Sequence, residues 1–380
     1  MRRLRVLVVD DSTAIRKVLS EAIGRAPDLE LCGTAPNGQV ALERLEAAAP
    51  DVVTLDIEMP VLDGISTLRT LKGLRPRLPV LMFSSHTVRG ALATLDALAA
   101  GASDFVAKPV VAGPSEALAF VEKEVLPRLR ALGGRDAGPT PPDARPADAA
   151  GGPASAPPRS PPAPPRLVGR TARAPLQALV VAVSTGGPQA LASFLPALPR
   201  GLPVPILVVQ HMPPLFTRIL AERLSSLGPN PVVEGIDGLD AAPGRVVLAP
   251  GGAQHMVVGH GVKGAPPRLK LDAGPPENSC RPAADPLFRT AAEVWGAGLV
   301  AVVLTGMGRD GCLGAARVRE LGGTVLVQDR ESAVVWGMPG AVVSAGLAEA
   351  ELPIDALAAE VARRAGQGRV RTQAVAAGRP

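Results

Sequence analysis

The sequence contains no tyrosine, and aromatic residues make up only 2% of its 380 positions. Its net charge of +5 is small and is not gathered into a basic cluster. Proteins that bind nucleic acid present a basic face, and those that bind single strands add aromatic side chains on which bases stack. The composition therefore argues against nucleic acid as a partner.

Cysteine is also scarce: Cys32, Cys280 and Cys312 are the only three, and their spacing is not that of metal ligands. Neither a structural zinc site nor a disulfide framework is expected, which fits a reducing compartment. The sequence has no uninterrupted run of about 18 apolar residues, the length that a membrane span requires. Met1 leads directly into a strand without a signal-peptide pattern. We expect a cytoplasmic protein without membrane insertion.

Proline and glycine are abundant, with 41 residues of each. Residues 133–175 consist mainly of proline, alanine, glycine and arginine, and such a segment buries too little apolar surface to offset the entropy of ordering. We predict a flexible linker over 133–175 between two α/β domains, at 1–132 and 176–368. A disordered tail is expected over 369–380.

The first domain alternates five short apolar strands with helices, which predicts a doubly wound parallel sheet. Polar residues stand at the carboxyl ends of these strands, and such ends share one crevice. They are Asp10, Asp11, Asp56, Ser84 and Lys108. Three neighbouring carboxylates favour a hard cation such as Mg²⁺, and a carboxylate beside Mg²⁺ and a lysine suits phosphoryl transfer. Any one of these residues could simply be a solvent-exposed helix cap or turn residue. That alternative explains the five together poorly.

The segments Val-Val-Asp-Asp-Ser, Leu-Asp-Ile-Glu-Met-Pro, Phe-Ser-Ser and Ala-Lys-Pro resemble the receiver domain of response regulators. The resemblance implies a flavodoxin-like fold with strand order 2-1-3-4-5. It implies phosphorylation of Asp56 by a histidine kinase, and Mg²⁺ held by Asp11 and Asp56 with support from Asp10. Ser84 and Lys108 would contact the phosphoryl group.

The second domain is organised around the stretch Leu179-Val-Val-Ala-Val-Ser-Thr-Gly-Gly-Pro188. Its apolar half predicts a buried strand of a parallel sheet, the two glycines permit a sharp turn, and the proline opens a helix. Ser184 then lies at the carboxyl edge of the sheet beneath free backbone N–H groups. The alternative is a glycine-rich turn that only connects two elements or binds phosphate.

His211 and Asp310 also follow apolar strands, so their side chains can converge with Ser184 at one sheet edge. A serine needs a base to take its proton, and the imidazole needs a carboxylate that fixes its tautomer. Glycine-rich loops around them expose N–H groups for an oxyanion hole. Two alternatives remain: His255 competes for the role of base, and Asp310 caps the helix that follows it.

Five motifs of this domain are similar to those of the CheB family of chemotaxis protein-glutamate methylesterases. They are Ser-Thr-Gly-Gly-Pro, Gln-His-Met-Pro-Pro, Ala-Pro-Gly-Gly, Cys-Arg-Pro-Ala-Ala-Asp-Pro-Leu-Phe and Leu-Thr-Gly-Met-Gly-Arg-Asp-Gly. The resemblance implies a triad of Ser184 as nucleophile, His211 as general base and acid, and Asp310 as its orienter. It implies an oxyanion-hole N–H at Met307, with Gly186 as the second donor.

The sequence departs from the family pattern at two places. Ala182-Val183 precedes the serine where glycine and a small residue are usual, and Arg309 stands where asparagine is usual. The larger Val183 can crowd the nucleophile turn, and Arg309 can alter substrate contacts. Neither change removes a catalytic group, so we expect activity with a shifted specificity.

The resemblance implies a phosphorylation-activated esterase that releases methanol from glutamate γ-methyl esters on the cytoplasmic helices of chemoreceptors. The same chemistry extends to deamidation of receptor glutamines, and Mg²⁺ would serve only the receiver, with no cofactor for the esterase. We also expect the unphosphorylated receiver to cover Ser184. The alternative is a response regulator whose output domain binds a ligand or partner without catalysis.

Overall fold

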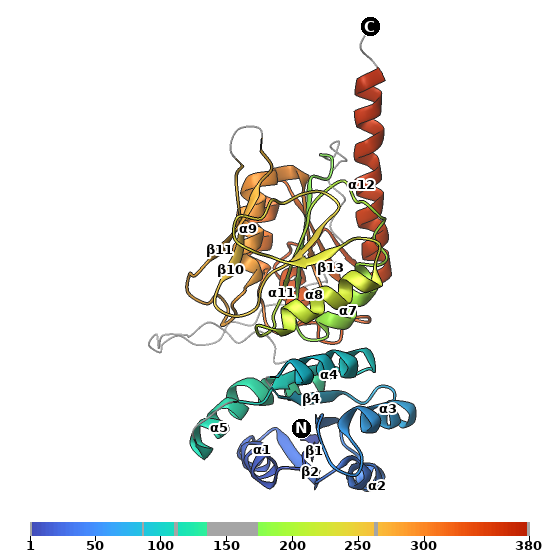
Figure 1. Cartoon of the computed structure of the whole chain (residues 1–380), viewed down its shortest axis with the longest axis vertical. Helices are drawn as coiled ribbons and strands as arrows, with labels where there is room; N and C mark the ends of the chain where they lie inside the picture. The colour runs from blue at the N-terminus through green and yellow to red at the C-terminus, as the bar shows by residue number, and fades with distance from the viewer. Residues whose placement is uncertain (1, 86, 110–112, 135–173, 262–264, 378–380) are drawn as a thin grey trace, which may run out of the picture.

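The computed structural model describes residues 2–85, 87–109, 113–134, 174–261 and 265–377. Two α/β domains pack against each other, the first blue to teal and the second green to red in Figure 1. Most of the predicted linker, 133–175, lies outside the described residues. Among the helices that are described, none combines the length and the apolar character needed to cross a lipid bilayer.

The first domain contains a five-stranded parallel sheet, which confirms the predicted doubly wound fold. The strand order is β2-β1-β3-β4-β5, the order that the receiver resemblance implies. The strands are short and apolar, and each ends at the same edge of the sheet. They are β1 (Leu4–Val9), β2 (Leu29–Ala35), β3 (Val52–Asp56), β4 (Val80–Ser84) and β5 (Asp104–Ala107).

Helices cover both faces of this sheet, and side-chain caps fix the start of several of them. Ser12 Oγ accepts from Ile15 N at the start of α1. Asn37, Asp63 and Thr87 cap α2, α3 and α4 in the same way. The helices are α1 (Thr13–Arg25), α2 (Gly38–Ala48), α3 (Gly64–Leu74), α4 (Val88–Ala99), α5 (Pro114–Phe120) and α6 (Leu126–Leu132), the last two joined by a π-helical turn over Val121–Val125.

The second domain contains a seven-stranded sheet in which every pairing is parallel. The strand order is β14-β13-β12-β6-β7-β9-β8, so the strand that precedes Ser184 is the central one. Residues 179–183 are fully buried, as their uninterrupted apolar pattern predicts. The strands are β6 (Ala178–Val183), β7 (Ile206–Gln210), β8 (Val232–Glu234), β9 (Val246–Leu248), β12 (Leu299–Val303), β13 (Thr324–Gln328) and β14 (Ala350–Leu352).

Helices cover this sheet too, and an antiparallel hairpin of β10 (His255–Gly259) and β11 (Arg268–Asp272) stands apart from it. The last helix extends into the segment 369–380 that we expected to be a disordered tail, so residues 369–377 are helical instead. The helices are α7 (Gly187–Phe194), α8 (Phe216–Leu227), α9 (Ala284–Trp295), α10 (Cys312–Glu320), α11 (Gly337–Ser344) and α12 (Ile354–Ala377), with a 3-10 turn over Gly296–Gly298.

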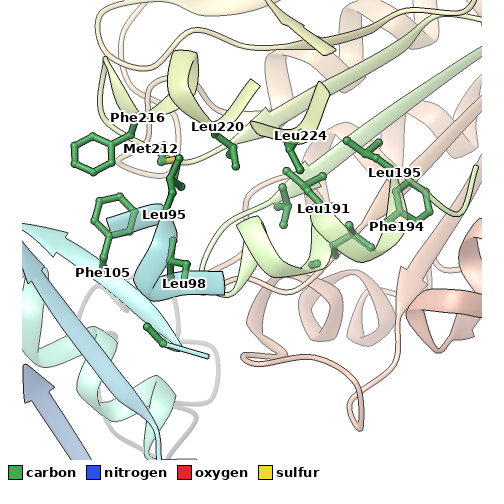
Figure 2. Packing of buried hydrophobic residues seen from close by; sticks show 14 of the residues in the cluster. Leu95, Leu98, Phe105, Leu191, Phe194, Leu195, Met212, Phe216, Leu220 and Leu224 are labelled. Carbon is green, nitrogen blue, oxygen red and sulfur yellow. The ribbon is translucent and has the colours of Figure 1, made fainter. Parts of the chain in front are cut away.

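The two domains meet where α4 of the first faces α7 and α8 of the second (Figure 1). The ring of Phe105 stacks on that of Phe216, with centroids 4.7 Å apart and an interplanar angle of 23°. Figure 2 shows Leu95 and Leu98 of α4 beside this pair, in one buried cluster with Met212 of the second domain. The interface is therefore an apolar core shared by both domains.

Candidate active site

Ser184 stands at the turn between β6 and α7. Its N–H donates to Thr305 O at 3.0 Å, and its carbonyl accepts from Gly187 N at 2.8 Å. Gly186 has a φ of 75°, a left-handed conformation that glycine adopts without strain. A Cβ on Gly306 would lie 2.8 Å from Ser184 Cβ, so glycine is what lets the neighbouring loop approach this closely. The turn is fixed, and the half-buried Ser184 is presented at the sheet edge.

His211 follows β7, and its imidazole lies against the carboxylate of Asp310 in the loop after β12. His211 Nε2 and Asp310 Oδ2 are 2.7 Å apart, and the Asp310 side chain is only 2% exposed. Strands β6, β7 and β12 are neighbours and run parallel, so their carboxyl ends bring Ser184, His211 and Asp310 to one edge. This is the arrangement that the three strand ends predict.

The N-terminal end of α9 holds the carboxylate of Asp310. Asp310 Oδ2 accepts from Ala284 N at 2.6 Å, and Oδ1 accepts from Asp285 N at 3.1 Å. Asn278 Nδ2 donates to Asp310 Oδ1 at 3.1 Å and to Asp285 Oδ2 at 2.9 Å. Burial opposes the ionisation of Asp310, but the hydrogen bonds from His211 and the backbone outweigh it and lower the pKa of Asp310. Asp310 is therefore a fixed anion that can orient an imidazole.

The other imidazole nitrogen of His211, Nδ1, faces Cys280 Sγ at 3.6 Å. Burial disfavours the imidazolium, but the hydrogen bonds to Asp310 and Cys280 outweigh it and raise the pKa of His211 to about 10. Within the described residues, no hydrogen bond joins Ser184 Oγ to His211. Both residues nevertheless line one cavity of about 290 Å³, whose other wall belongs to the first domain. Serine and imidazole are thus brought together, while Nδ1 is occupied by the thiol.

His255, the competing candidate for the base, has both ring nitrogens engaged elsewhere. Ala283 N donates to His255 Nδ1 at 3.1 Å, so this nitrogen is an acceptor and the proton lies on Nε2. His255 Nε2 in turn donates to Pro275 O at 3.0 Å, and the side chain is buried. His255 therefore supports the start of α9, and the geometry favours His211 as the base.

The two expected oxyanion donors border the serine turn. Gly186 directly precedes α7, and Met307 lies in the loop that also carries Asp310. In the part of the chain that the structure describes, the N–H groups of Gly186 and Met307 donate to no acceptor. Met307 is half-buried and packs against a hydrophobic cluster made of first-domain residues and Val335. Two N–H groups are therefore available near Ser184, and their role in an oxyanion hole stays a prediction.

Three residues with a supporting role were not found from the sequence. Gln210 Nε2 donates to Ser184 O at 3.0 Å and to His211 O at 3.2 Å, which ties the nucleophile turn to the histidine loop. Asn278 and Asp285 belong to the network that holds Asp310. Two of them carried a signal: Gln210 is the one polar residue in the apolar strand β7, and Asp285 is the aspartate of the Cys-Arg-Pro-Ala-Ala-Asp-Pro-Leu-Phe motif.

The two departures from the family pattern have different surroundings. Val183 is fully buried, and its Cγ2 would lie 2.8 Å from a Cβ on Gly187. The missing side chain at Gly187 therefore makes room for the larger valine, which does not crowd the serine. Arg309 is exposed beside Asp310, where it faces solvent instead of the triad.

A second site lies at the carboxyl edge of the first sheet. One carboxylate oxygen each of Asp10, Asp11 and Asp56 lies within 4.8 Å of the others, an oxygen donor set that suits a hard divalent cation. Lys108 Nζ is 2.7 Å from Asp56 Oδ2 and 3.2 Å from Asp10 Oδ2. Burial, with the charges of Asp10 and Asp11, raises the pKa of Asp56 to about 6 against the opposing effect of Lys108. The residues present fit the predicted Mg²⁺ site.

Ser84 is placed differently from the other four residues of this set. It is fully buried, and its Oγ accepts from Thr94 Oγ1 at 2.6 Å and donates to Gly90 O at 3.1 Å. The cavity beside Asp56, also about 290 Å³, is lined by Ser85 and not by Ser84. In this structure Ser84 therefore points away from the position of a phosphoryl group, and a contact requires it to leave Thr94.

Two family models match the chain. The response regulator receiver domain matches residues 6–119, and the CheB methylesterase matches residues 179–361. The crystal structure of the Thermotoga maritima CheB methylesterase catalytic domain is similar at 40% identity, covering 50% of this chain and 98% of that one, with a TM-score of 0.48.

Two relatives are similar along nearly the whole chain. A protein-glutamate methylesterase/protein-glutamine glutaminase of Nocardioides sp. is 47% identical over 365 residues, covering 96% of each chain. A protein of the same name from Trichodesmium erythraeum is 41% identical, covering 96% of this chain and 100% of that one. The chain therefore belongs to the CheB family of protein-glutamate methylesterases/protein-glutamine glutaminases, with a response regulator receiver domain before the methylesterase domain.

Proposed function

We propose that this chain is a serine hydrolase that hydrolyses glutamate γ-methyl esters on the cytoplasmic helices of chemoreceptors, and that it also deamidates receptor glutamines. The observation that carries the proposal is the His211–Asp310 pair at the edge where three parallel strands end, with His211 lining the same cavity as Ser184. The names of the relatives supply the substrate class.

The first half of the reaction forms an acyl-enzyme. Ser184 Oγ attacks the ester carbonyl carbon and passes its proton to Nδ1 of His211, the nitrogen not held by Asp310. For this step the imidazole exchanges its contact with Cys280 for one with Ser184. The N–H groups of Gly186 and Met307 would donate to the oxyanion. The intermediate then collapses, the bond to the methoxy oxygen breaks, and that oxygen leaves as methanol with the proton from His211.

The second half frees the enzyme. His211 takes a proton from water, the hydroxide adds to the acyl carbon, and the bond to Ser184 Oγ breaks as the proton returns to serine. The receptor keeps a glutamate carboxylate. With a glutamine side chain the leaving group of the first step is ammonia instead of methanol, and the second step is the same.

A methanol-release assay on membranes that carry methylated receptors tests the proposal. The full chain should release methanol and Ser184→Ala should release none. The alternative is an output domain that only binds a partner. In that case neither the full chain nor Ser184→Ala would release methanol. If a phosphodonor raises the rate of methanol release in the same assay, phosphorylation of the receiver domain activates the esterase domain.

For the receiver domain we propose phosphorylation of Asp56, with a histidine kinase as phosphodonor. Asp10, Asp11 and Asp56 would hold Mg²⁺, which when bound neutralises charge on the phosphoryl oxygens. Lys108, already 2.7 Å from Asp56, would supply a second positive charge to the same oxygens. Ser84 would contact the phosphoryl group after leaving Thr94.

Asp56→Asn is expected to abolish the stimulation of methanol release by a phosphodonor, because the amide cannot form the acyl phosphate. Chelation of Mg²⁺ by EDTA should have the same effect on the unmutated chain. Glu43→Gln, which changes an exposed carboxylate on α2, serves as the matched control and should keep the stimulation. A stimulated Asp56→Asn variant would place the phosphorylation site elsewhere.

The pH dependence of the esterase is expected to follow His211. Because the pKa of His211 is raised to about 10, the imidazole is protonated at neutral pH and accepts the serine proton only after losing its own. We expect kcat/KM of the unphosphorylated chain to keep rising above pH 8 instead of levelling near pH 7, where an unperturbed histidine with a pKa of about 6.5 would already be deprotonated. Cys280→Ala removes one of the two hydrogen bonds that raise this pKa and should move the rise to lower pH. If the pH profile of kcat/KM in Cys280→Ala is the same as in the unmutated chain, a group other than His211 limits the rate.

A further inference from the structure

The contact between His211 and Cys280 is not used by the proposed esterase reaction. Cys280 Sγ, His211 Nδ1, His211 Nε2 and Asp310 Oδ2 form a row, with separations of 3.6 Å at the thiol end and 2.7 Å at the carboxylate end. A thiol beside an imidazole that a carboxylate orients is the arrangement that activates a cysteine nucleophile. We propose that Cys280 is a modification site, a thiol that His211 activates for oxidation by hydrogen peroxide. Once Cys280 is oxidised, His211 can no longer accept the proton of Ser184.

A rigid turn places Cys280 against the imidazole. Glu277 and Cys280 are joined by both backbone hydrogen bonds, at 2.8 and 3.2 Å, across two residues with left-handed φ angles of 50° and 60°. The Glu277 carboxylate is held by Arg289 at 2.6 and 2.9 Å. Asn278, the first residue inside the turn, is anchored to Asp310. The thiol is therefore positioned by the same network that positions the carboxylate of the triad.

The thiol is also within reach of a small oxidant. Cys280 is half-buried and the two residues before it, Asn278 and Ser279, are exposed. It does not itself line the cavity between the two domains, although His211 does. The pKa of His211 is raised, so its imidazole is a strong base for the proton of the thiol, whose sulfur lies 3.6 Å from Nδ1.

The other two cysteines lack this environment. Cys312 is buried and its Sγ donates to Ala341 O at 3.6 Å, while Cys32 lies half-buried in strand β2. Burial raises the pKa of both thiols and so disfavours their thiolates. The chain thus contains two internal references for the reactivity of Cys280.

The oxidation step balances without any further reagent. The proton of the Cys280 thiol passes to His211 Nδ1, and the sulfur attacks one oxygen of hydrogen peroxide. The S–O bond forms as the O–O bond breaks, so sulfur is oxidised and peroxide is reduced. The departing hydroxide takes the proton from His211 and leaves as water. Cys280 is left as a sulfenic acid, and a thiol reductant restores it through a mixed disulfide.

The consequence for the esterase rests on the proposed function. A sulfenic oxygen on Cys280 lies between the sulfur and Nδ1, the nitrogen that must accept the proton of Ser184. A hydrogen bond from that hydroxyl to Nδ1 occupies the lone pair of the base. Peroxide should therefore inhibit methyl-ester hydrolysis in a reversible way.

Peptide mapping of the full chain tests the site without any esterase assay. The protein is treated with hydrogen peroxide in the presence of dimedone, which traps sulfenic acids, and the labelling rates of the three cysteines are compared by mass spectrometry. Cys280 should be labelled at least about tenfold faster than Cys32 and Cys312. Equal rates for Cys280 and Cys32 would overturn the proposal, and this comparison needs no variant.

Two matched variants test the role of the imidazole. His211→Gln should slow labelling of Cys280 by about tenfold or more, while His260→Gln, at an exposed histidine, should not. Circular dichroism establishes that both variants are folded. A folded His211→Gln variant that is labelled at the unmutated rate would remove His211 from the proposal.

A third variant separates this proposal from the proposed function. Ser184→Ala should lose methanol release yet keep the labelling of Cys280, because the serine takes no part in the thiol chemistry. In the active chain, peroxide should lower methanol release and dithiothreitol should restore it. In the Cys280→Ala variant, the rate of methanol release after peroxide treatment should equal the rate before it, whatever the absolute rate of this variant is. Equal inhibition of Cys280→Ala would place the sensitivity at another residue.

Discussion

Replacing Ser184 by alanine should abolish methanol release, with a fall in kcat of about 10⁴-fold or more. His211→Ala should cost as much, because nucleophile and base act as a unit and neither works without the other. Asp310→Asn should cost about 10⁴-fold, because an amide cannot hold the imidazole in the required tautomer or stabilise the imidazolium. Methanol release from methylated receptors, measured at saturating substrate, gives these values.

The control for the histidine is the second buried imidazole. His255 is hydrogen-bonded at both nitrogens to the backbone, so its replacement should lower thermal stability and affect the rate only through folding. His260→Ala, on the surface, should keep the unmutated rate. Near-normal turnover in His211→Ala, together with loss in a folded His255→Ala variant, would mean that the wrong histidine was assigned.

The convergence of Ser184, His211 and Asp310 could be predicted because it depends on local sequence. Each follows an apolar strand, and parallel strands deliver their carboxyl ends to one edge. The edge strands β8 and β14 have only three residues each, too few to show a period in the sequence. The fold class was therefore predictable from the strong central strands, while the sheet edges were not.

The surroundings of the triad depend on contacts that no local pattern encodes. Cys280 and Asn278 reach the histidine and its carboxylate from a loop about 70 residues after His211 in the chain. The side-chain rotation of Ser84 depends on Thr94, a neighbour on α4. Sequence motifs assign residues to a site, but the partner of each side chain is decided by packing.

The covering of Ser184 by the receiver is an expectation that the domain interface supports. The cavity that holds Ser184 and His211 is lined on its other side by receiver residues, among them Phe105 and Arg128. Thr185, next to the nucleophile, donates to the buried Asp104 Oδ2 at 2.7 Å. These receiver residues stand beside Ser184 on the side from which a receptor helix, with a diameter of about 10 Å including side chains, would have to approach.

Polar contacts at the rim of this interface fix how the domains are seated. Gln189 of α7 donates from Nε2 to the carbonyls of Leu98, at 3.1 Å, and Ala102. Arg223 of α8 donates to Asp96 Oδ1 of α4 at 2.7 Å. Because Arg223 and Asp96 are partly exposed, their charges can be changed without disturbing either core. The pair is therefore the best place to loosen the interface in the full chain.

Arg223→Asp in the full, unphosphorylated chain should raise the rate of methanol release by about tenfold, since like charges across the rim destabilise the covered state by about 1.4 kcal/mol. Asp96→Arg in the same chain restores an ion pair with reversed polarity and should return the rate to that of the unmutated protein. Phosphodonor should stimulate Arg223→Asp less than it stimulates the unmutated chain, because part of the population is already uncovered. Basal rates measured for the unmutated, single and double variants test this directly. If Arg223→Asp is folded but no faster, the receiver does not limit access to Ser184, and phosphorylation must instead act on the catalytic groups, for example by releasing His211 from Cys280.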